Sequence, residues 1–169
     1  MTVGVLIYGY GGHGRVLAEL LNISLKCNIG VFDDQKPEDL PVYIEYLGQY
    51  NKNTHPDKKI ILAIGDNNLR AEISAQISHA FFTFIHPNAY VSSKTQIGIG
   101  TIVLQNAIIQ NKTSIGVHCI VNIGSLIDHD VVIEDFCHLA PATYVGGGSK
   151  ISSFSCLDPG QIIPRLTIL

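Results

Sequence analysis

YVSSKTQIGIGTIVLQNAIIQNKTSIGVHCIVNIGSLIDHDVVIEDFCHLAPATYVGGGSKISSFSCLDPGQIIPRLTIL, residues 90–169, is the stretch that decides the fold of this chain. Every sixth residue in it is aliphatic: Val91, Ile97, Val103, Ile109, Ile115, Val121, Ile127, Ile133, Leu139, Val145, Ile151, Leu157, Ile163 and Leu169. A strand repeats every two residues and a helix every 3.6, so neither explains this pattern. A period of six predicts a parallel β-helix built from hexapeptide repeats.

The residues around each aliphatic position support a triangular coil. The second residue before it is short almost throughout, which lets a corner close tightly, and the third residue after it is often Gly or Asn. Such residues are expected where the backbone turns and φ becomes positive. Three sides make a coil of about 18 residues, so we expect between about four and five coils. Their strands should pair in parallel around a continuous aliphatic core.

The region before the repeats, residues 1–85, alternates expected strands and helices. Strands are predicted at 3–8, 29–32 and 59–64 and near 81–85, and helices at 15–22 and 69–78. The polar segment 35–56 contains several prolines and is predicted to be a loop, with at most a short helix. This order indicates a small parallel α/β sheet of Rossmann type, a Rossmann-like domain. We place the boundary at His86-Pro87, so the second domain is residues 86–169.

The composition favours a well-buried soluble protein. The 169 residues are 46% hydrophobic and 15% charged, and the net charge of −3 gives no reason to expect a nucleic acid or an anionic membrane as partner. The apolar N-terminus lacks a basic region, so it is read as a strand rather than a signal peptide, and no segment is long enough to span a membrane. We therefore expect a cytoplasmic protein.

Four cysteines without a CxxC pair argue against a metal site or a secreted disulfide framework. Cys119 and Cys137 are one coil apart and should stack as small buried residues, with a disulfide as the alternative.

The loop Gly9-Tyr10-Gly11-Gly12-His13-Gly14 follows the first expected strand and precedes a helix. It matches G-x-G-x-x-G, and Asp33 lies about 20 residues on, where an acid can hold a ribose hydroxyl. Alone, this pattern suggests an NAD enzyme. The sheet is too short for two mononucleotide halves, however, and the only other domain is a β-helix, so a nucleoside diphosphate with an attached group fits better. A tight turn without ligand is the alternative, and for His13 a solvated loop position is the alternative to ligand contact.

The segment Ile127-Asp128-His129-Asp130 breaks the repeat with charged and titratable residues. His129 and Asp130 fall at a corner, where neighbouring side chains can cooperate, so Asp130 can hold one ring nitrogen and raise the basicity of the other. Surface decoration is the alternative. His138 should point outward from a strand. The remaining histidines have no such acid beside them and are read as surface residues: His55, His79, His86 and His118.

Several motifs together resemble a known family. They are the G-H-G loop, the Asp33-Asp34 pair, A-I-G-D-N-N-L-R at 63–70, the His-Pro junction, and I-D-H-D with a second histidine nine residues after the first. The combination looks like the bacterial sugar acetyltransferases with a left-handed β-helix. These include N-acetyltransferases of nucleotide-linked 4-amino sugars and sialic acid O-acetyltransferases. The resemblance covers nearly the whole chain and implies left-handed coils.

The resemblance also implies roles for individual residues. In the N-terminal domain, Gly12, His13, Gly14, Asp33, Asp34, Gly65 and Asn68 would bind a nucleotide sugar. His129 would be the general base and Asp130 would increase its basicity, while His138, Gly147 and Pro159 would contact acetyl-CoA. Proteins of this family are homotrimers whose sites lie between neighbouring β-helices.

The leading hypothesis is therefore acetyl-CoA-dependent N-acetylation of a nucleotide-linked amino sugar, without a metal. Two alternatives stay open: O-acetylation of a sialic or related nonulosonic acid, and a nucleotide-sugar-binding protein without catalysis. The repeats stop in mid-coil at Leu169 without a polar cap. We accordingly expect a C-terminus that is truncated relative to the family, with fewer CoA contacts and reduced activity.

Overall fold

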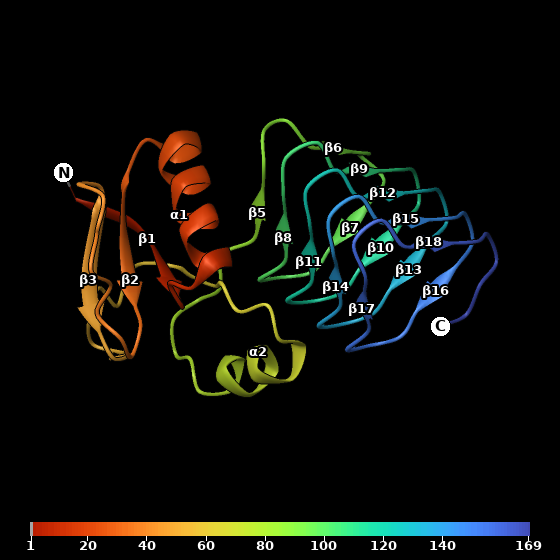
Figure 1. Ribbon diagram of the computed structural model, residues 1–169. Helices are drawn as coiled ribbons and strands as arrows, with labels where there is room; N and C mark the ends of the chain where they lie inside the picture. The colour runs from red at the N-terminus through yellow and green to blue at the C-terminus, as the bar shows by residue number, and fades with distance from the viewer. Residues whose placement is uncertain (1) are drawn as a thin grey trace. The chain divides into compact units, whose positions relative to one another are not determined.

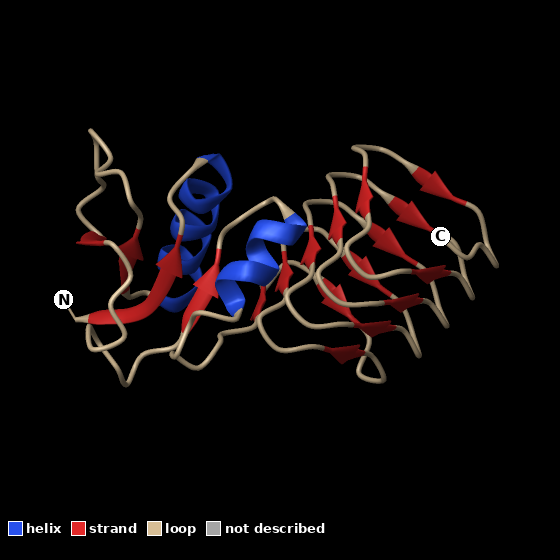
Figure 2. Ribbon diagram, turned by 90° about the horizontal axis from the view of Figure 1, so that it is seen from below, coloured by secondary structure: helices blue, strands red, loops and turns tan. Residues whose placement is uncertain are grey.

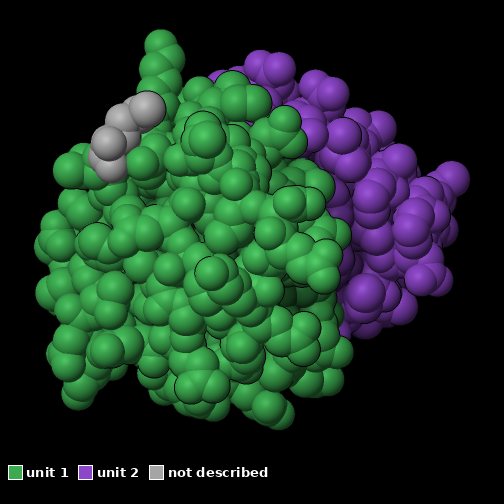
Figure 3. Space-filling model, turned by 60° about the vertical axis from the view of Figure 1, so that its left-hand side comes forward, with its two compact units in different colours: residues 1–82 green, residues 83–169 purple. Residues whose placement is uncertain are grey.

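The computed structural model describes residues 2–169, which form two compact units. The division lies between Phe82 and Thr83, and the two units are coloured green and purple in Figure 3. The division expected from the sequence lies a few residues later, at His86-Pro87. Each unit is described by itself below.

The first unit is a four-stranded parallel sheet with the order β3-β2-β1-β4 and two helices (Figure 1). Its elements are β1 (Val3–Tyr8), α1 (Gly12–Leu25), β2 (Asn28–Phe32), β3 (Ile44–Gly48), β4 (Ile60–Leu62) and α2 (Asn67–Ser74). The inner strands β1 and β2 and the edge strand β4 are apolar and mostly buried, as expected for a parallel sheet. The predicted parallel α/β arrangement of this region is confirmed.

Helix α1 begins at Gly12, three residues before the predicted start, and its buried side chains Leu17, Ala18 and Leu21 share one face. Gly14 lies so close to the end of β1 that a Cβ there would collide with the Gly9 carbonyl oxygen. The third glycine of the G-x-G-x-x-G motif therefore permits close packing of helix on strand.

Two predictions for this region were wrong. Segment 35–56 was expected to be a loop, but β3 lies within it and pairs with β2. Its side chains are mostly half-buried, so this edge strand lacks the apolar run that marks the inner strands. The strand expected near 81–85 is divided: Phe81 forms a single bridge with Ile60, whereas Phe84 and Ile85 pair with a strand of the second unit.

The second unit is a parallel β-solenoid of the left-handed type, and its six-residue repeats are confirmed (Figure 2). Its first face contains β5 (Phe84–Ile85), β8 (Ile102–Val103), β11 (Ile120–Val121), β14 (His138–Leu139) and β17 (Cys156–Leu157). The second face contains β6 (Tyr90–Val91), β9 (Ile108–Ile109), β12 (Leu126–Ile127), β15 (Tyr144–Val145) and β18 (Ile162–Ile163). The third face contains β7 (Gln96–Ile97), β10 (Ser114–Ile115), β13 (Val132–Ile133) and β16 (Lys150–Ile151).

In each of the two-residue strands from β8 to β18, the second residue points inward and belongs to one continuous aliphatic core. At the start of the stack, Val91 and Ile97 are only partly buried and pack against this core. Partners along a face are 18 residues apart, as in Leu126 with Tyr144 and Ile127 with Val145. Hydrophobic burial in this stacked core is the main source of stability expected for such a solenoid.

Each face ends in a three-residue corner, and we number the first, second and third corners after the face that precedes them. The last residue of every corner from Gly100 to Leu166 has a positive φ, between 51° and 75°. The predicted left-handed turn is thus confirmed, but Lys112, His118 and Phe136 also adopt it. The hydrogen bonds between coils therefore hold this conformation even at residues that disfavour a positive φ.

Cys119 and Cys137 are fully buried in the core, as predicted, and each Sγ donates to a backbone carbonyl of the next coil. The surface assignment of two histidines was wrong. His118 is 5% exposed and stacks on Phe136, which stacks in turn on Phe154. His79 is also 5% exposed, and its ring lies within hydrogen-bonding distance of the Tyr50 hydroxyl and the Thr54 carbonyl oxygen. Sequence spacing identifies a corner but does not show which aromatic ring will cover it.

Candidate active site

In the first unit, three loops leave the carboxyl ends of neighbouring parallel strands. The glycine loop follows β1, Asp33 follows β2, and Gly65 follows β4. The Gly9 and Ala63 loops are adjacent, because a Cβ at Gly9 would lie 3.4 Å from the Ala63 carbonyl oxygen. The carboxyl edge of a parallel sheet is where ligands bind in open α/β folds. The predicted residues of this unit therefore gather at one edge.

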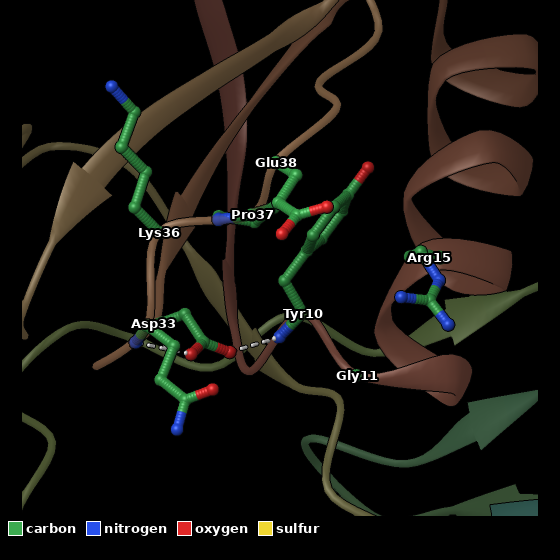
Figure 4. A pocket seen from close by; sticks show the side chains of 8 residues that line it. Tyr10, Gly11, Arg15, Asp33, Lys36, Pro37 and Glu38 are labelled. Atoms are coloured by element: carbon green, nitrogen blue, oxygen red, sulfur yellow. Dashed lines mark hydrogen bonds between the residues drawn. The ribbon is translucent and has the colours of Figure 1, made fainter.

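Asp33 connects two of these loops through its carboxylate. The backbone N–H of Tyr10 donates to Oδ2 at 2.6 Å, and that of Gln35 donates to Oδ1 at 2.9 Å (Figure 4). The Tyr46 hydroxyl donates to the Asp33 carbonyl oxygen at 2.9 Å. Hydrogen bonds to an ionised acceptor are short and strong. In this structure Asp33 thus holds the glycine loop in position, a role that the ribose interpretation did not include.

A pocket of about 390 Å³ opens beside the Asp33 carboxylate. It is lined by Tyr10, Gly11, Arg15, Asp33, Gln35, Lys36, Pro37 and Glu38, most of which are drawn in Figure 4. Burial is the main cause of the raised pKa of the Tyr10 hydroxyl, and Tyr43 raises it further, whereas the nearby Arg15 lowers it. Arg15 lies beside the start of α1 and Lys36 lies across the pocket from it (Figure 4). A cation beside a helix that begins at a bare glycine is suited to phosphate.

The other predicted residues of this unit do not line this pocket. Gly12 and His13 lie in the first turn of α1, and a Cβ at Gly11 or Gly12 would meet no atom within 4 Å, so a ligand can approach the backbone there. Asp34 is exposed and does not line the pocket. Asn68 is exposed in the first turn of α2.

Arg70 is a buried residue that the sequence analysis did not identify. Its side chain is 1% exposed and donates to the carbonyl oxygens of Ile64 at 2.8 Å and Gly65 at 3.1 Å. It also donates to the Asp66 carbonyl and, at 2.6 Å, to Asn67 Oδ1. The guanidinium therefore fixes the loop after β4, to which Gly65 belongs. An arginine at the second position of the predicted helix 69–78 gave no sign of this inward direction.

In the second unit, His129 and Asp130 occupy the second corner after β12. The imidazole Nδ1 lies 2.7 Å from Asp130 Oδ2, and the two side chains are 60% and 53% exposed. Because an ionised carboxylate only accepts hydrogen bonds, the neutral imidazole here carries its proton on Nδ1 and its lone pair on Nε2. The predicted pairing of ring and carboxylate is present, and the free nitrogen is on an accessible ring.

Gly147 lies one coil after His129 in the same corner. A Cβ there would lie 3.1 Å from Cε1 and 3.2 Å from Nε2 of His129, so a side chain at this position would require the imidazole to shift. The preceding residue is Gly146, which has no side chain.

The backbone N–H of the middle residue of a corner makes no backbone hydrogen bond in the described part of the solenoid. At Ile123 and His129 this N–H is capped by the preceding side chain, Asn122 Oδ1 or Asp128 Oδ1, each at 2.8 Å. Gly146 cannot supply such a cap, and the Gly147 N–H makes no hydrogen bond within residues 2–169 although the residue is buried. The N–H groups of exposed middle residues such as Ile99, Asp135 and Arg165 are also without a hydrogen bond in this part of the chain, so Gly147 is distinguished by its place beside His129.

Two other predicted residues lie elsewhere on the solenoid. His138 is half-buried on the first face, with its Nε2 3.2 Å from the Asn122 side-chain amide. Pro159 is exposed in the first corner. A single chain thus brings together His129, Asp130 and Gly147 in the second corner, whereas His138 and Pro159 belong to the first face and its corner.

The second face carries a column of exposed apolar side chains that the sequence analysis did not identify. They recur every 18 residues: Tyr90, Ile108, Leu126, Tyr144 and Ile162. A pocket of about 300 Å³ lies among them, lined by Ile108, Gln110, Leu126, Ile127, Asp128 and Tyr144. The signal was present in the sequence as apolar residues directly before inward aliphatics. Contiguous exposed apolar surface of this kind is typical of a binding or assembly surface.

Within residues 2–169, no group of three or more His, Cys, Asp or Glu side chains is arranged to hold a metal ion. In the same part of the chain, neither helix has the length and hydropathy needed to cross a membrane.

Residues 4–77 match the family model of the PglD N-terminal domain. The chain is homologous to UDP-N-acetylbacillosamine N-acetyltransferase of Bacillus subtilis (strain 168), with 33% identity over 105 residues. This alignment covers 57% of the chain and 49% of the relative, so the chain spans about half the length of the curated relative that it matches.

Solved structures of similar proteins cover nearly the whole chain. One is a variant of perosamine N-acetyltransferase from Caulobacter crescentus, with a histidine replaced by asparagine, in complex with CoA and GDP-perosamine. It has a TM-score of 0.83 and 27% identity, over 99% of this chain and 86% of that one. Another is the acetyltransferase domain of PglB from Neisseria gonorrhoeae in complex with acetyl coenzyme A. It has a TM-score of 0.70 and 26% identity, over 98% and 86% of the two chains.

Proposed function

We propose that this chain transfers an acetyl group from acetyl-CoA to the amine of a nucleotide-linked sugar. The observation that carries the proposal is the second corner, where His129 is hydrogen-bonded through Nδ1 to Asp130 and rests against Gly147. The relatives support it, because they are N-acetyltransferases of nucleotide-linked amino sugars or were solved with CoA.

The first unit would bind the nucleotide sugar as a Rossmann-like domain. Its strand order β3-β2-β1-β4 is the beginning of the order found in dinucleotide-binding folds. The diphosphate would lie at the start of α1, near Gly12, His13 and Gly14, with Arg15 and Lys36 of the pocket as cations. The remaining residues of this proposed site are Asp33, Asp34, Gly65 and Asn68.

In the second corner, His129 would act as the general base. The amine attacks the thioester carbon, and Nε2 takes the proton that becomes acidic as the C–N bond forms. Asp130 fixes the tautomer through Nδ1–H and stabilises the imidazolium that results. The thiolate of CoA then leaves and is reprotonated. Direct transfer needs no nucleophilic side chain, and holding both substrates in place supplies much of the acceleration.

The oxyanion of the tetrahedral intermediate would be stabilised by the backbone N–H of Gly147. This N–H is uncapped because Gly146 precedes it, and a Cβ at Gly147 would touch the base. A donor beside the base lies near the carbon that the amine attacks. Loss of one such donor typically costs about 10²–10³-fold in turnover.

The CoA-binding site would include His138, Gly147 and Pro159. Gly147 is in the second corner and Pro159 in the first, so one chain does not bring them together. We therefore propose that neighbouring copies of a homotrimer complete the site. The exposed apolar column from Tyr90 to Ile162 on the second face offers the kind of surface that such an assembly would bury.

The experiment is an acetyl-transfer assay with a UDP-linked 4-amino sugar, GDP-perosamine, a free sialic acid and a CMP-linked nonulosonic acid. Transfer to one of the two amino sugars supports the proposal. Transfer only to the nonulosonic acids would make the chain an O-acetyltransferase, and nucleotide-sugar binding without transfer to any acceptor would make it a binding protein.

A further inference from the structure

The residue before the proposed base, Asp128, lies on the opposite side of the imidazole from Asp130. Its Oδ1 accepts the backbone N–H of His129 at 2.8 Å and lies 3.9 Å from Nε2. The carboxylate is therefore held in place beside the nitrogen that Asp130 leaves with a lone pair. Asp130 binds Nδ1, whereas Asp128 faces the nitrogen that would meet the substrate.

The surroundings of Asp128 reduce the screening of its negative charge by solvent. Its side chain is 34% exposed and lines the pocket of about 300 Å³ with the apolar residues Ile108, Leu126 and Tyr144. Within residues 2–169 no lysine or arginine forms an ion pair with this carboxylate. Charges that interact next to apolar surface are less screened than charges in open water.

We propose that Asp128 attracts the acceptor as an ammonium ion and so selects an amine over a hydroxyl. This inference rests on the proposed function. An acceptor atom that gives its proton to Nε2 must come within about 3 Å of it. Because Asp128 Oδ1 is only 3.9 Å from Nε2, that atom lies within about 7 Å of the carboxylate, which is inside the range of a partly screened charge. A sugar ammonium gains an attraction there, whereas a neutral hydroxyl does not.

The acceptor that binds as an ammonium ion must lose two protons to become the amide. The bound ammonium first loses one proton to solvent, which reaches the ring because His129 is 60% exposed. The neutral amine then attacks the thioester carbon, and Nε2 takes the second proton. The C–S bond breaks, and the CoA thiolate receives that proton from the imidazolium. The products are the amide, CoA and one released proton. Asp128 is thus a positioning residue that exchanges no proton.

The test compares Asp128→Asn with the unchanged chain. Asparagine keeps an oxygen for the His129 N–H and removes only the charge. Two probes are used: a UDP-linked 4-amino sugar, and the same nucleotide sugar with a hydroxyl in place of the amine. We expect the Kd for the amine probe in calorimetry to rise about 10-fold, on the scale of a partly screened ion pair. The Kd for the hydroxyl probe should stay within about 2-fold. The salt dependence of amine binding should also flatten.

Asp135→Asn is the matched control, because Asp135 Oδ1 caps the Val117 N–H at 2.8 Å in another corner, as Asp128 caps His129. It should leave both Kd values unchanged. An equal change for the two probes in Asp128→Asn, or no change for the amine, would overturn the inference while the proposed function stands. If the unchanged chain binds neither probe, the proposed function fails as well.

Discussion

Gly147 and His129 are in contact across one coil of the solenoid: a Cβ at Gly147 would lie 3.1 Å from Cε1 of the imidazole. A contact between 18-residue neighbours depends on the register of the coils, which pairs Leu126 with Tyr144 and so aligns the corner that follows. Gly147 thus leaves room for the His129 ring, and Gly146 leaves the Gly147 N–H without a side-chain acceptor.

Gly147→Ala should lower kcat by about 10²-fold, because the added methyl displaces the imidazole and crowds the proposed oxyanion donor. The KM for the nucleotide sugar should change little. Steady-state kinetics with each substrate varied in turn measure both values. Gly124→Ala is the control, since a Cβ there meets no atom within 4 Å. It should only reduce stability, by about 1 kcal/mol, because φ is positive at Gly124. Equal losses of activity in the two variants would contradict this account of Gly147.

Asp130→Asn should lower kcat by about 10-fold or more, because the amide no longer favours a proton on Nδ1 and stabilises the imidazolium less. The thermal unfolding midpoint should change little, since the pair is more than half exposed. Turnover at saturating concentrations of both substrates measures the effect. Wild-type kcat in this variant would show that Asp130 is surface decoration.

Asp33→Ala should raise the KM for the nucleotide sugar by about 10-fold, with kcat nearly unchanged. The alanine removes the acceptor of the Tyr10 and Gln35 N–H groups, so the glycine loop loses its brace. A hydrogen bond to a charged acceptor contributes about 1.5–3 kcal/mol, part of which should appear as weaker binding. An unchanged KM for the nucleotide sugar, together with an unchanged KM for acetyl-CoA, would place Asp33 outside the binding site.

Arg70→Met should destabilise the first unit by about 3 kcal/mol, because the carbonyls of Ile64 and Gly65 lose their donor inside the protein. Thermal or urea unfolding measures this change. Ser74→Ala, in the same helix, removes one hydrogen bond to the Ala71 carbonyl and should cost about 1 kcal/mol or less. A similar effect of the two substitutions would show that Arg70 does not hold the loop.

The sequence predicted most of the solenoid because a six-residue period restricts the chain strongly. Once Ile127 is inward, His129 and Asp130 must be at a corner, which permits the pairing observed at 2.7 Å. Burial at the corners was less predictable: His118 was expected at the surface but stacks on Phe136. That contact depends on which side chains the next coil supplies.

In the first unit, local patterns located the apolar inner strands but not the half-buried strand β3. The positions of Asp33 and Gly65 at one sheet edge followed from the parallel order of the strands. Their partners did not, since Arg70 and the Tyr10 N–H meet these residues through tertiary packing. Side-chain direction is decided by contacts between segments that are far apart in the sequence.

The most direct test of the acyl-transfer mechanism is His129→Ala. We predict that kcat falls by roughly 10²-fold or more, the usual scale for loss of a general base, while calorimetry gives an unchanged Kd for the nucleotide sugar. Wild-type turnover in this variant, or an equal loss of binding and turnover, would contradict the account.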